Sequence, residues 1–335
     1  MKILFVGELI GNSGYHYKIL KKKNKNIHVI NPSFLFRKIY ILRLLFIHIS
    51  PKIFEKILDL YFVYKVKNLY DIIYVTSGEY IGKKTIINLK KNTHKIILYC
   101  PDNPFVKRDK KRWVLFKQSA KYYDRIVYIQ PSRIKLAKRH GLANHYLINP
   151  HYERSIHKKH KITKYFKKRF NSDVIFIGTW FPDRGRFVKR MIESNINIKI
   201  YGSRWDKDPF YKILKSKINL GHFDGPIYSK LIQSSKIAIC LTSTENLDSI
   251  TSRSIEIPAI GTFMLAIKTN THEKILISNK EAVYFKSVNE CIKKCQYYLT
   301  NSYKREQIAR NGHKKIVNRL KLNNENFFNR IFNFN

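Results

Sequence analysis

The sequence DSITSRSIEIPAIGTFML, residues 248–265, carries the pattern on which the predicted fold depends. It contains two carboxylates, Asp248 and Glu256, which lie eight positions apart. Gly261 predicts a turn, and the apolar run 262–267 that follows has the length of a buried strand. Helix, glycine turn and buried strand in this order indicate an α/β domain.

The same stretch also suggests a binding site. A carboxylate near the start of a helix that faces a cleft can hold sugar hydroxyls, and the free backbone N–H groups at that start can hold phosphates. Arg253 lies between the two acids, and Pro258 predicts a break in the helix. This stretch alone fits both a nucleotide-sugar site and an ordinary αβ unit, and the other residues of the chain are needed to distinguish them.

Length and composition indicate a folded protein of two domains. The chain has 335 residues, of which 44% are hydrophobic, so it can form substantial cores. No apolar run reaches the roughly 18–20 residues that a membrane span needs. The start, MKILFVGELIG, lacks a small-residue cleavage pattern and therefore predicts a first strand rather than a signal peptide. The four scattered cysteines are expected to be free thiols of a cytoplasmic protein.

The net charge of +42 is extreme and unevenly distributed. Residues 1–172 carry 38 Lys/Arg against 9 Asp/Glu, whereas residues 173–335 carry 27 against 14. Such a surface attracts polyanions such as anionic lipid, acidic glycans or nucleic acid. The alternative is that Lys, Ile and Asn are abundant throughout, as an AT-rich genome would produce, and that most of the lysines are merely solvated.

Six apolar segments predict a first Rossmann-like domain over residues 1–150. They are residues 2–6, 27–30, 71–76, 95–100, 125–129 and 146–148. The first is followed by Gly7, Gly11 and Gly14, whose spacing departs from G-x-G-x-x-G and so predicts only a sharp turn. The fourth ends at Asp102 and Asn103, at the sheet edge where α/β proteins bind ligands.

Residues 34–67 predict two helical segments broken at Ser50 and Pro51. The first mixes Arg37, Lys38 and Arg43 with bulky apolar residues. Two interpretations stay open for it, a helix packed on the sheet or a basic helix lying in a membrane interface.

Residues 151–172 are basic and weakly periodic, and we expect a linker there whose three histidines are solvated. A second α/β domain is predicted over residues 173–335, with helices at its C-terminal end. Its expected strands are residues 173–177, 198–201, 236–241 and 262–267.

From Asp173 onward the chain resembles the CgeB-like, spore-maturation-type glycosyltransferases, a branch of the GT-B group close to the retaining family-four type enzymes. The resemblance rests on DVIFIGTWFPDRG, KIAICL, NLDSITSRSIEIPAIGTFML, HEKIL, KEAVYF and YYLTNSYKREQIARNGHKKI, in this order. It implies an α/β protein of GT-B architecture, with two Rossmann-like domains facing a central cleft.

The resemblance also implies site residues. Related enzymes have a Glu-x7-Glu pattern at the donor site, and Asp248 and Glu256 fall at that spacing. Glu256 would bind the donor ribose, and Gly261 is where the family places its turn glycine. Asp248 would contact the transferred sugar, although it is one methylene shorter than the family's Glu.

A catalytic set and a phosphate-binding set follow from the same resemblance. Arg184 occupies the place of the basic residue that neutralises the donor diphosphate, and Arg253 is a second candidate. Glycosyl transfer leaves negative charge on the diphosphate, which arginines stabilise well. The remaining nucleotide-sugar residues are predicted to be Gly178, Thr179, Ser249 and Thr251.

The acceptor side is predicted to include Gly11, His16, Asp102 and Asn103 of the first domain. No metal and no cofactor are expected beyond the nucleotide sugar as co-substrate, since the letters of an Asp-x-Asp motif at Asp206 and Asp208 look like a solvated turn.

The residues and the resemblance together predict a metal-independent hexosyltransferase of surface polysaccharide synthesis, and the resemblance alone implies that the anomeric configuration is retained. The enzyme would be cytoplasmic, peripheral on the membrane, and active on a glycan or lipid-linked acceptor. Two alternatives stay open. A sugar-nucleotide epimerase shares the architecture, and a non-enzymatic polyanion-binding protein would account for the charge; nucleic acid is the less favoured polyanion, because recognition motifs for it are absent.

Overall fold

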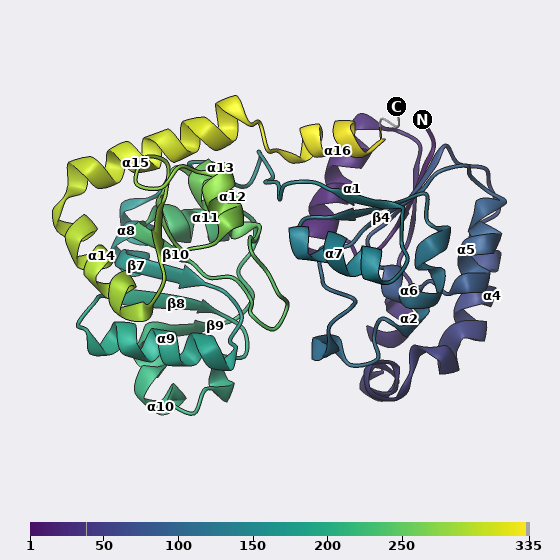
Figure 1. Ribbon diagram of the computed structural model, residues 1–335, viewed down its shortest axis with the longest axis horizontal. Coiled ribbons are helices and arrows are strands. Elements are labelled where there is room, and N and C mark those ends of the chain that lie inside the picture. Colours follow the sequence, from purple (N-terminus) through teal and green to yellow (C-terminus); the bar gives the residue numbers. More distant parts are fainter. Residues whose placement is uncertain (38, 333–335) are drawn as a thin grey trace. The chain divides into compact units, whose positions relative to one another are not determined.

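The chain forms two units, each built on a parallel six-stranded sheet (Figure 1). The computed structural model describes residues 1–37 and 39–332, so Lys38 of the predicted basic helical segment and the last three residues of the second predicted domain lie outside the described residues. The first unit comprises Met1–Asn149, the segment Ser243–Asp248 and the end of the chain from Ile331. The second comprises Pro150–Thr242 and Ser249–Arg330.

The first sheet has the strand order β2-β1-β3-β4-β5-β6, and every pair is parallel. Its strands are β1 (Ile3–Val6), β2 (Ile27–Ile30), β3 (Ile72–Val75), β4 (Ile96–Tyr99), β5 (Arg125–Tyr128) and β6 (His145–Leu147). The strands β1, β3 and β4 are buried throughout, as expected for parallel strands with helices on both faces. All six predicted strands are confirmed.

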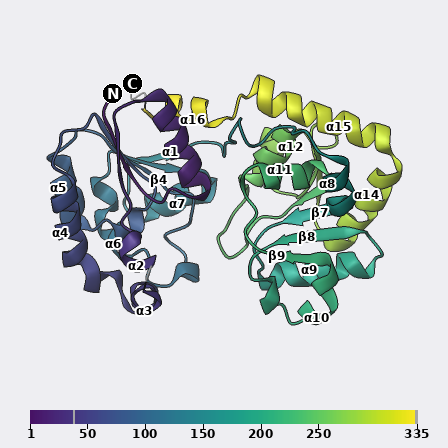
Figure 2. The same ribbon diagram turned by 180° about the vertical axis from the view of Figure 1, so that it is seen from behind.

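Helices connect these strands, and short 3-10 or π turns are labelled η. They are α1 (Gly11–Lys23), α2 (Phe34–Arg37), α3 (Tyr40–Leu44), η1 (Leu45–Ile49), η2 (Pro51–Phe54), α4 (Glu55–Lys65), η3 (Gly78–Tyr80), α5 (Lys83–Lys90), η4 (Lys107–Asp109), α6 (Val114–Ser119), η5 (Ala120–Tyr122) and α7 (Pro131–Arg139). Helices α4 and α5 lie side by side (Figure 2). The predicted break is confirmed, because Ser50 is extended and its Oγ accepts from the Lys52 N–H at the start of η2.

The second sheet has the order β12-β11-β10-β7-β8-β9 and is also parallel. Its strands are β7 (Ser172–Ile177), β8 (Ile198–Gly202), β9 (Ile218–Leu220), β10 (Ser235–Cys240), β11 (Phe263–Ile267) and β12 (Val283–Phe285). Along β7, Val174 and Phe176 join one hydrophobic core and Ile175 and Ile177 another. Both faces of the sheet are therefore covered.

The helices of the second unit include three that the site uses, α9, α12 and α13. The complete set is α8 (Lys164–Phe170), α9 (Pro182–Glu193), η6 (Trp205–Lys207), α10 (Tyr211–Leu214), η7 (Lys215–Lys217), α11 (Gly225–Gln233), α12 (Arg253–Ile260), α13 (Asn270–Ile275), α14 (Val288–Thr300), α15 (Ser302–Lys314), η8 (Lys315–Arg319) and α16 (Asn324–Phe332). The last residues of α16 belong to the first unit, where the Phe332 ring contacts that of Tyr74.

The stretch 248–265 forms helix α12, a turn at Gly261 and strand β11, in the predicted order. The predicted break at Pro258 is wrong, because the helix continues to Ile260. A proline at this position removes one backbone hydrogen bond but lies within two residues of the end, where the helix is about to stop anyway. Gly261 caps the helix with φ of 88°, a left-handed conformation that favours glycine.

The prediction that the three histidines of residues 151–172 are solvated is wrong for His157, which is 4% exposed. This segment packs with the second unit and contains helix α8. His151 stacks on Phe327 with ring centroids 3.9 Å apart, and His160 bonds to the Ile156 carbonyl. The basic composition of the segment did not predict these contacts, because composition does not show which residues pack against a histidine.

All four cysteines are free and buried, so none is available at the surface. Among the residues described, no helix combines the length and the apolar character that crossing a bilayer requires.

Candidate functional site

Arg184 lies at the carboxyl ends of two neighbouring strands of the second sheet. It is 6% exposed and comes from the first turn of α9. One terminal nitrogen donates to the Thr179 carbonyl after β7 at 2.7 Å, and the other to the Thr242 carbonyl after β10 at 3.4 Å. Its guanidinium also lies 4.9 Å from the Phe181 ring centroid. A fixed positive charge at this edge is suited to a bound diphosphate.

Gly178 follows β7 directly, and its carbonyl oxygen packs so closely against Gly202 that the latter position requires glycine. A Cβ on Gly202, at the end of β8, would lie 2.0 Å from the Gly178 carbonyl oxygen. That oxygen accepts a hydrogen bond from the buried Trp205 indole at 2.8 Å. The side chain of Thr179 bonds to Ser203 at 3.3 Å. The chain therefore turns tightly just before the N-terminus of α9.

The loop before α12 is held by a buried network. The Ser254 hydroxyl accepts from the Thr251 N–H at 3.1 Å and lies 2.7 Å from His272 Nε2. His272 Nδ1 faces the Ile267 carbonyl at 2.9 Å, so this nitrogen carries the proton and Nε2 accepts from Ser254. The Ser249 hydroxyl accepts from Thr271 at 2.8 Å. Helix α13 thus positions the segment that precedes α12.

Arg253 is the first residue of α12. Its Nε is buried and has no hydrogen-bond partner, and within the described residues its guanidinium forms no ion pair. A buried donor without a partner is costly in free energy unless a ligand or water supplies an acceptor. Arg253 is therefore well suited to an anionic ligand.

Glu256 is 7% exposed and lies in the first turn of α12. Its Oε1 is 3.8 Å from Nε2 of His157. His157 Nδ1 accepts from the Glu153 N–H at 2.9 Å, so its proton sits on Nε2 and faces the carboxylate. Burial lowers the pKa of His157, and Glu256 and Glu153 act in the opposite direction. Burial raises the pKa of the neighbouring Tyr228, and the Glu256 charge adds to that shift.

Asp248 and Glu256 belong to different units, because the chain passes from the first unit to the second between residues 248 and 249. The Asp248 carboxylate accepts from Arg133 at 2.6 Å and from the Asn246 side chain at 2.9 Å. Burial raises the pKa of Asp248, although the Arg133 charge opposes that shift. Its closest polar contacts are therefore structural.

Two of the predicted acceptor-side residues, Asn103 and His16, are buried in the first unit and bonded there to neighbouring side chains. Asn103 is fully buried and bonds with both its N–H and its side-chain amide to Asn246, at 3.2 Å each. His16 is 1% exposed, with Nδ1 2.8 Å from the Tyr74 hydroxyl. Asp102 is paired with Arg108 at 3.1 Å, and Gly11 starts α1 with φ of 53°.

Asp208 is not the solvated turn residue that the sequence suggested. It is 6% exposed, and its carboxylate accepts from the Trp180 indole at 2.6 Å and from the Phe210 N–H at 2.8 Å. Within the part of the chain that the structure describes, no group of three His, Cys, Asp or Glu side chains could hold a metal ion.

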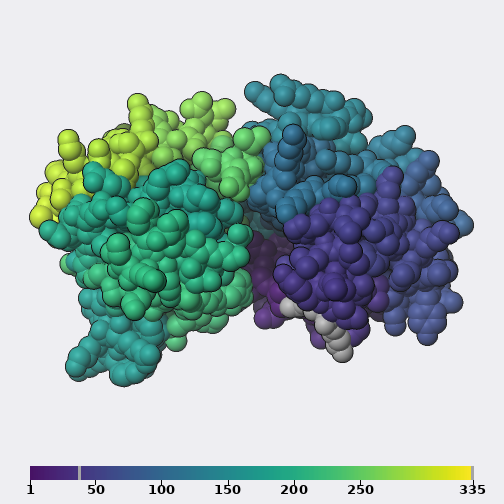
Figure 3. All heavy atoms as spheres, turned by 90° about the horizontal axis from the view of Figure 1, so that it is seen from below, coloured from purple at the N-terminus to yellow at the C-terminus, as the bar shows by residue number. Residues whose placement is uncertain are grey.

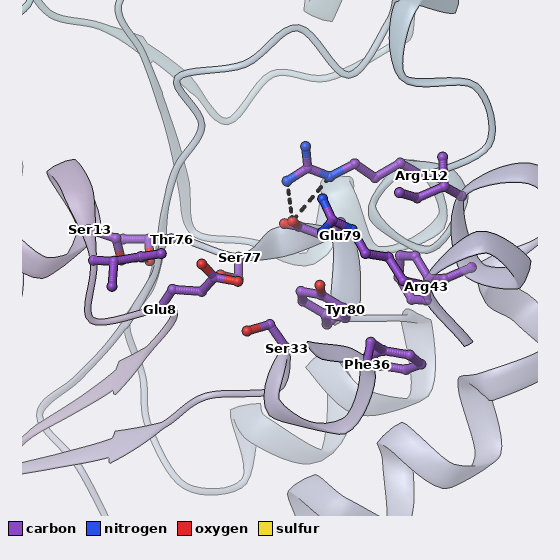
Figure 4. Close-up of a pocket in the computed structure, with 13 residues that line it drawn as sticks. Glu8, Ser13, Ser33, Phe36, Arg43, Thr76, Ser77, Glu79, Tyr80 and Arg112 are labelled. Atoms are coloured by element: carbon purple, nitrogen blue, oxygen red, sulfur yellow. Dashed lines mark hydrogen bonds and ion pairs between the residues drawn. The ribbon is translucent and has the colours of Figure 1, made fainter. Parts of the chain in front are cut away.

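The first unit contains a cavity of about 430 Å³ that the sequence did not reveal (Figure 4). It lies beyond the carboxyl ends of β1, β2 and β3, the edge at which open parallel sheets bind ligands. Its lining residues are Glu8, Ile10, Ser13, Ser33, Phe36, Arg43, Phe46, Ile47, Thr76, Ser77, Glu79, Tyr80 and Arg112. Carboxylates and hydroxyls face an aromatic wall, a combination suited to a hydroxyl-rich ligand.

The charges of this cavity are partly fixed by pairing. Arg112 donates its Nε to Glu79 at 3.2 Å and contacts the same oxygen with a terminal nitrogen. Glu79 is 5% exposed, and its charge raises the pKa of Arg112. Burial raises the pKa of Tyr80, and Glu79 adds to it, so the Tyr80 hydroxyl stays protonated. Figure 4 shows the Glu8 carboxylate directed into the cavity, across from Tyr80.

Two Rossmann-like units of this kind define the GT-B architecture, which confirms the predicted fold class. Residues 184–324 match the model of the family described as glycosyl transferase-like, a segment that includes Arg184, Arg253 and Glu256. No curated protein matches the chain in sequence.

Three solved structures illustrate the shared fold. The Anabaena HepE protein in complex with UDP-glucose has a TM-score of 0.67 at 10% identity, over 99% of this chain and 98% of that one. Sucrose-phosphate synthase from Thermosynechococcus elongatus reaches 0.69 at 11% identity, over 99% of both chains. A putative UDP-N-acetylglucosamine 2-epimerase from Listeria monocytogenes reaches 0.57 at 10% identity, over 99% and 94%.

Sequence reasoning missed His157, His272 and the cavity of the first unit. His272 stands in the motif HEKIL, but no spacing rule links it to Ser254, eighteen positions earlier. Glu8 and Glu79 each follow a predicted strand by a few residues, which is the signal that could have identified them.

Proposed function

We propose that the protein is a glycosyltransferase that takes its sugar from a nucleotide-sugar donor bound by the second unit. The match of residues 184–324 to the glycosyl transferase-like family is the observation that carries this proposal. The donor-side residues Arg184, Arg253 and Glu256 all lie in that segment, and the similarly folded HepE protein was solved with UDP-glucose.

The proposed chemistry follows from the placement of these groups. When the bond between sugar and diphosphate breaks, negative charge develops on the leaving phosphate oxygens. Arg184 and Arg253 are suited to stabilise it, without any metal. Glu256 accepts hydrogen bonds from the ribose hydroxyls, and His157 Nε2 lies 3.8 Å from its carboxylate. Retention of the anomeric configuration and transfer of a hexose are part of the proposal.

The cavity of the first unit is proposed to take the acceptor, in place of the buried His16 and Asn103. Its carboxylates and hydroxyls suit a sugar, and the wall formed by Phe36, Phe46 and Tyr80 suits a ring face or an apolar chain. A glycan or a lipid-linked glycan of a surface polysaccharide, met on the cytoplasmic face of the membrane, has this mixed character.

Donor binding is tested by thermal shift of the full chain with UDP, GDP and their sugars. A donor at about 100 times its Kd stabilises the folded protein by about 2.7 kcal/mol. Glu256→Gln is expected to weaken binding by roughly tenfold to a hundredfold, because it replaces a charged acceptor of hydrogen bonds. Glu273→Gln, in the same unit and paired with Lys268, is the matched control. Unchanged affinity in Glu256→Gln would contradict the assigned role.

An epimerase on the same fold is distinguished by its products. A transferase releases the nucleoside diphosphate as the acceptor is glycosylated, whereas an epimerase converts the sugar nucleotide without any acceptor. Epimerisation of UDP-N-acetylglucosamine by the protein alone, with no transfer to any acceptor, would replace the proposal.

A further inference from the structure

Helix α4 is apolar on two sides, although only one of them packs on the first unit. Phe54, Leu58 and Phe62 are buried, at 8%, 0% and 2% exposure. A second stripe, spaced by four, three and four residues, faces outward. It consists of Ile53 at the end of η2 and of Ile57, Leu60 and Tyr64 of α4, which are 57%, 56%, 70% and 69% exposed. Exposed apolar residues that gather along one side of a helix and are flanked by charged residues such as Lys56 mark a site of contact with a protein or a membrane.

The preceding helices repeat this arrangement. Phe36 and Phe46 pack with Phe54 and Leu58 into a small core that holds the helical segment on the unit. On the outer side, Tyr40 and Ile41 of α3 are 72% and 64% exposed, and Ile49 of η1 is 50% exposed. The packing of the segment is therefore complete without these residues.

The concentration of apolar surface is local. Of the 24 large hydrophobic residues that are exposed in the described part of the chain, 11 fall within residues 34–69. We call these 36 residues the docking segment. Figure 2 shows its helices α3 and α4 on the same unit, and Figure 3 shows the dark blue-purple atoms of this part of the chain at the molecular surface.

The charge of the docking segment decides which occupant fits. Its sequence holds seven Lys/Arg and two Asp/Glu. Lys52, Lys56, Lys65 and Lys67 are exposed beside the apolar stripe of α4, and the amines of Lys65 and Lys67 lie 5.3 and 5.8 Å from the Tyr64 ring centroid. A second copy of this segment would bring like charges together, whereas anionic lipid headgroups would pair with them while the apolar side chains enter the acyl boundary.

We propose that the docking segment lies on an anionic lipid bilayer. The bilayer would take the outer stripe of α4 and the exposed residues of α3 and η1, with the lysines at headgroup level. This deepens the proposed function, on which its link to catalysis rests: α2, α3 and η1 also line the cavity of the first unit through Phe36, Arg43 and Phe46. An acceptor carried by a lipid would thus enter from the surface on which the protein sits.

The test is co-sedimentation of the full-length protein with vesicles of phosphatidylcholine, with and without phosphatidylglycerol. The wild type is expected to bind only the anionic vesicles. Lys52→Gln/Lys56→Gln/Lys67→Gln should lower partitioning by about a hundredfold, since each cation near an anionic surface contributes about fivefold. The control Lys207→Gln/Lys212→Gln/Lys215→Gln removes the same charge from exposed positions of the second unit and should stay within about twofold.

The apolar contribution is tested with Ile53→Ser/Ile57→Ser/Leu60→Ser/Tyr64→Ser, which should reduce binding at least about tenfold. The control changes the exposed Tyr165, Ile213 and Tyr303 to serine. None of these residues lines the cavity, so every variant should keep the thermal shift with nucleotide sugars. This separates failure of docking from failure of the proposed function.

Three results would overturn the proposal. The first is absence of wild-type binding to anionic vesicles, and the second is an equal loss of vesicle binding in the control variants. The third is a dimer in solution that is lost in the serine variant. The last result would assign the segment to a second copy of the chain instead. If the serine variant does not fold, co-sedimentation of the variant with the three lysines replaced tests the proposal, because those side chains are solvated and their loss should not affect folding.

Discussion

Replacing Asp248 by alanine is expected to destabilise the protein strongly, because it leaves the Arg133 guanidinium in the interior without its anion. Arg133 is fully buried, the Asp248 side chain is 12% exposed, and the two are joined at 2.6 Å. Removing one partner of a buried ion pair costs about 3–5 kcal/mol. Arg133 keeps its bonds to Leu247 and Ser132, so we expect about 3 kcal/mol. This lowers Tm by about 6–12 °C in a unit of this size.

A double-mutant cycle measures the pair. Arg133→Met and Asp248→Leu are each expected to destabilise the protein in urea, and the double variant should recover much of the loss. Burial raises the pKa of Asp248 despite its partner, so desolvation offsets much of the attraction. The control cycle, Lys236→Ala with Asp173→Ala, tests a 2.7 Å pair with half-exposed lysine and should couple by less than about 1 kcal/mol.

Two results would refute this reasoning. Additivity of Arg133→Met and Asp248→Leu within about 0.5 kcal/mol would show that the pair is not coupled. If Asp248 is catalytic, Asp248→Asn should affect activity rather than stability, because asparagine keeps an oxygen that accepts a hydrogen bond from Arg133. If that variant melts like the wild type but loses transfer with donor binding intact, the carboxylate acts on the sugar.

Two further predictions concern stability. Burial lowers the pKa of His157 and His272, so the unfolded chain takes up protons at a higher pH than the folded one, and the free energy of unfolding should fall as the pH drops below about 6.5. In urea unfolding between about pH 7 and 5, His157→Gln/His272→Gln should make the free energy of unfolding depend less on pH. An unchanged pH dependence would contradict this prediction. Gly202→Ala should lower Tm well beyond Gly225→Ala, because only at Gly202 does the new Cβ meet a backbone oxygen, that of Gly178; equal effects would show that backbone strain alone matters.

The parallel strands could be predicted because both faces of each sheet are covered, which makes central strands continuous apolar runs. The sequence analysis missed β9 and β12, which are edge strands of three residues each. Three residues are too few to show the alternation of apolar and polar residues that would distinguish a strand from a buried turn. Helix α8 was also missed, because its one apolar pair, Phe166 and Phe170, stands in a short and otherwise basic segment.

The local placement of candidate residues could be predicted where one motif supplies them, and not where their partners come from distant parts of the chain. Glu256 and Arg184 are placed by the elements that their own sequences predict. The partner of Glu256, His157, precedes it by 99 positions, and Asn103 is buried because Asn246 closes over it, 143 positions away. Such burial depends on tertiary packing, and the sequence offered only the polar character of each residue.

The sequence left open whether the charge of +42 is functional or compositional, and the structure supplies a second observation that composition does not explain. An AT-rich genome would enrich Lys, Asn and Ile along the whole chain. It would not place 11 of the 24 exposed large hydrophobic side chains of the described residues within residues 34–69, roughly a tenth of the sequence. Folding alone favours polar residues on the outer side of α4. The lysines of the docking segment therefore lie where exposed apolar side chains are most concentrated, as the proposed contact with an anionic bilayer requires.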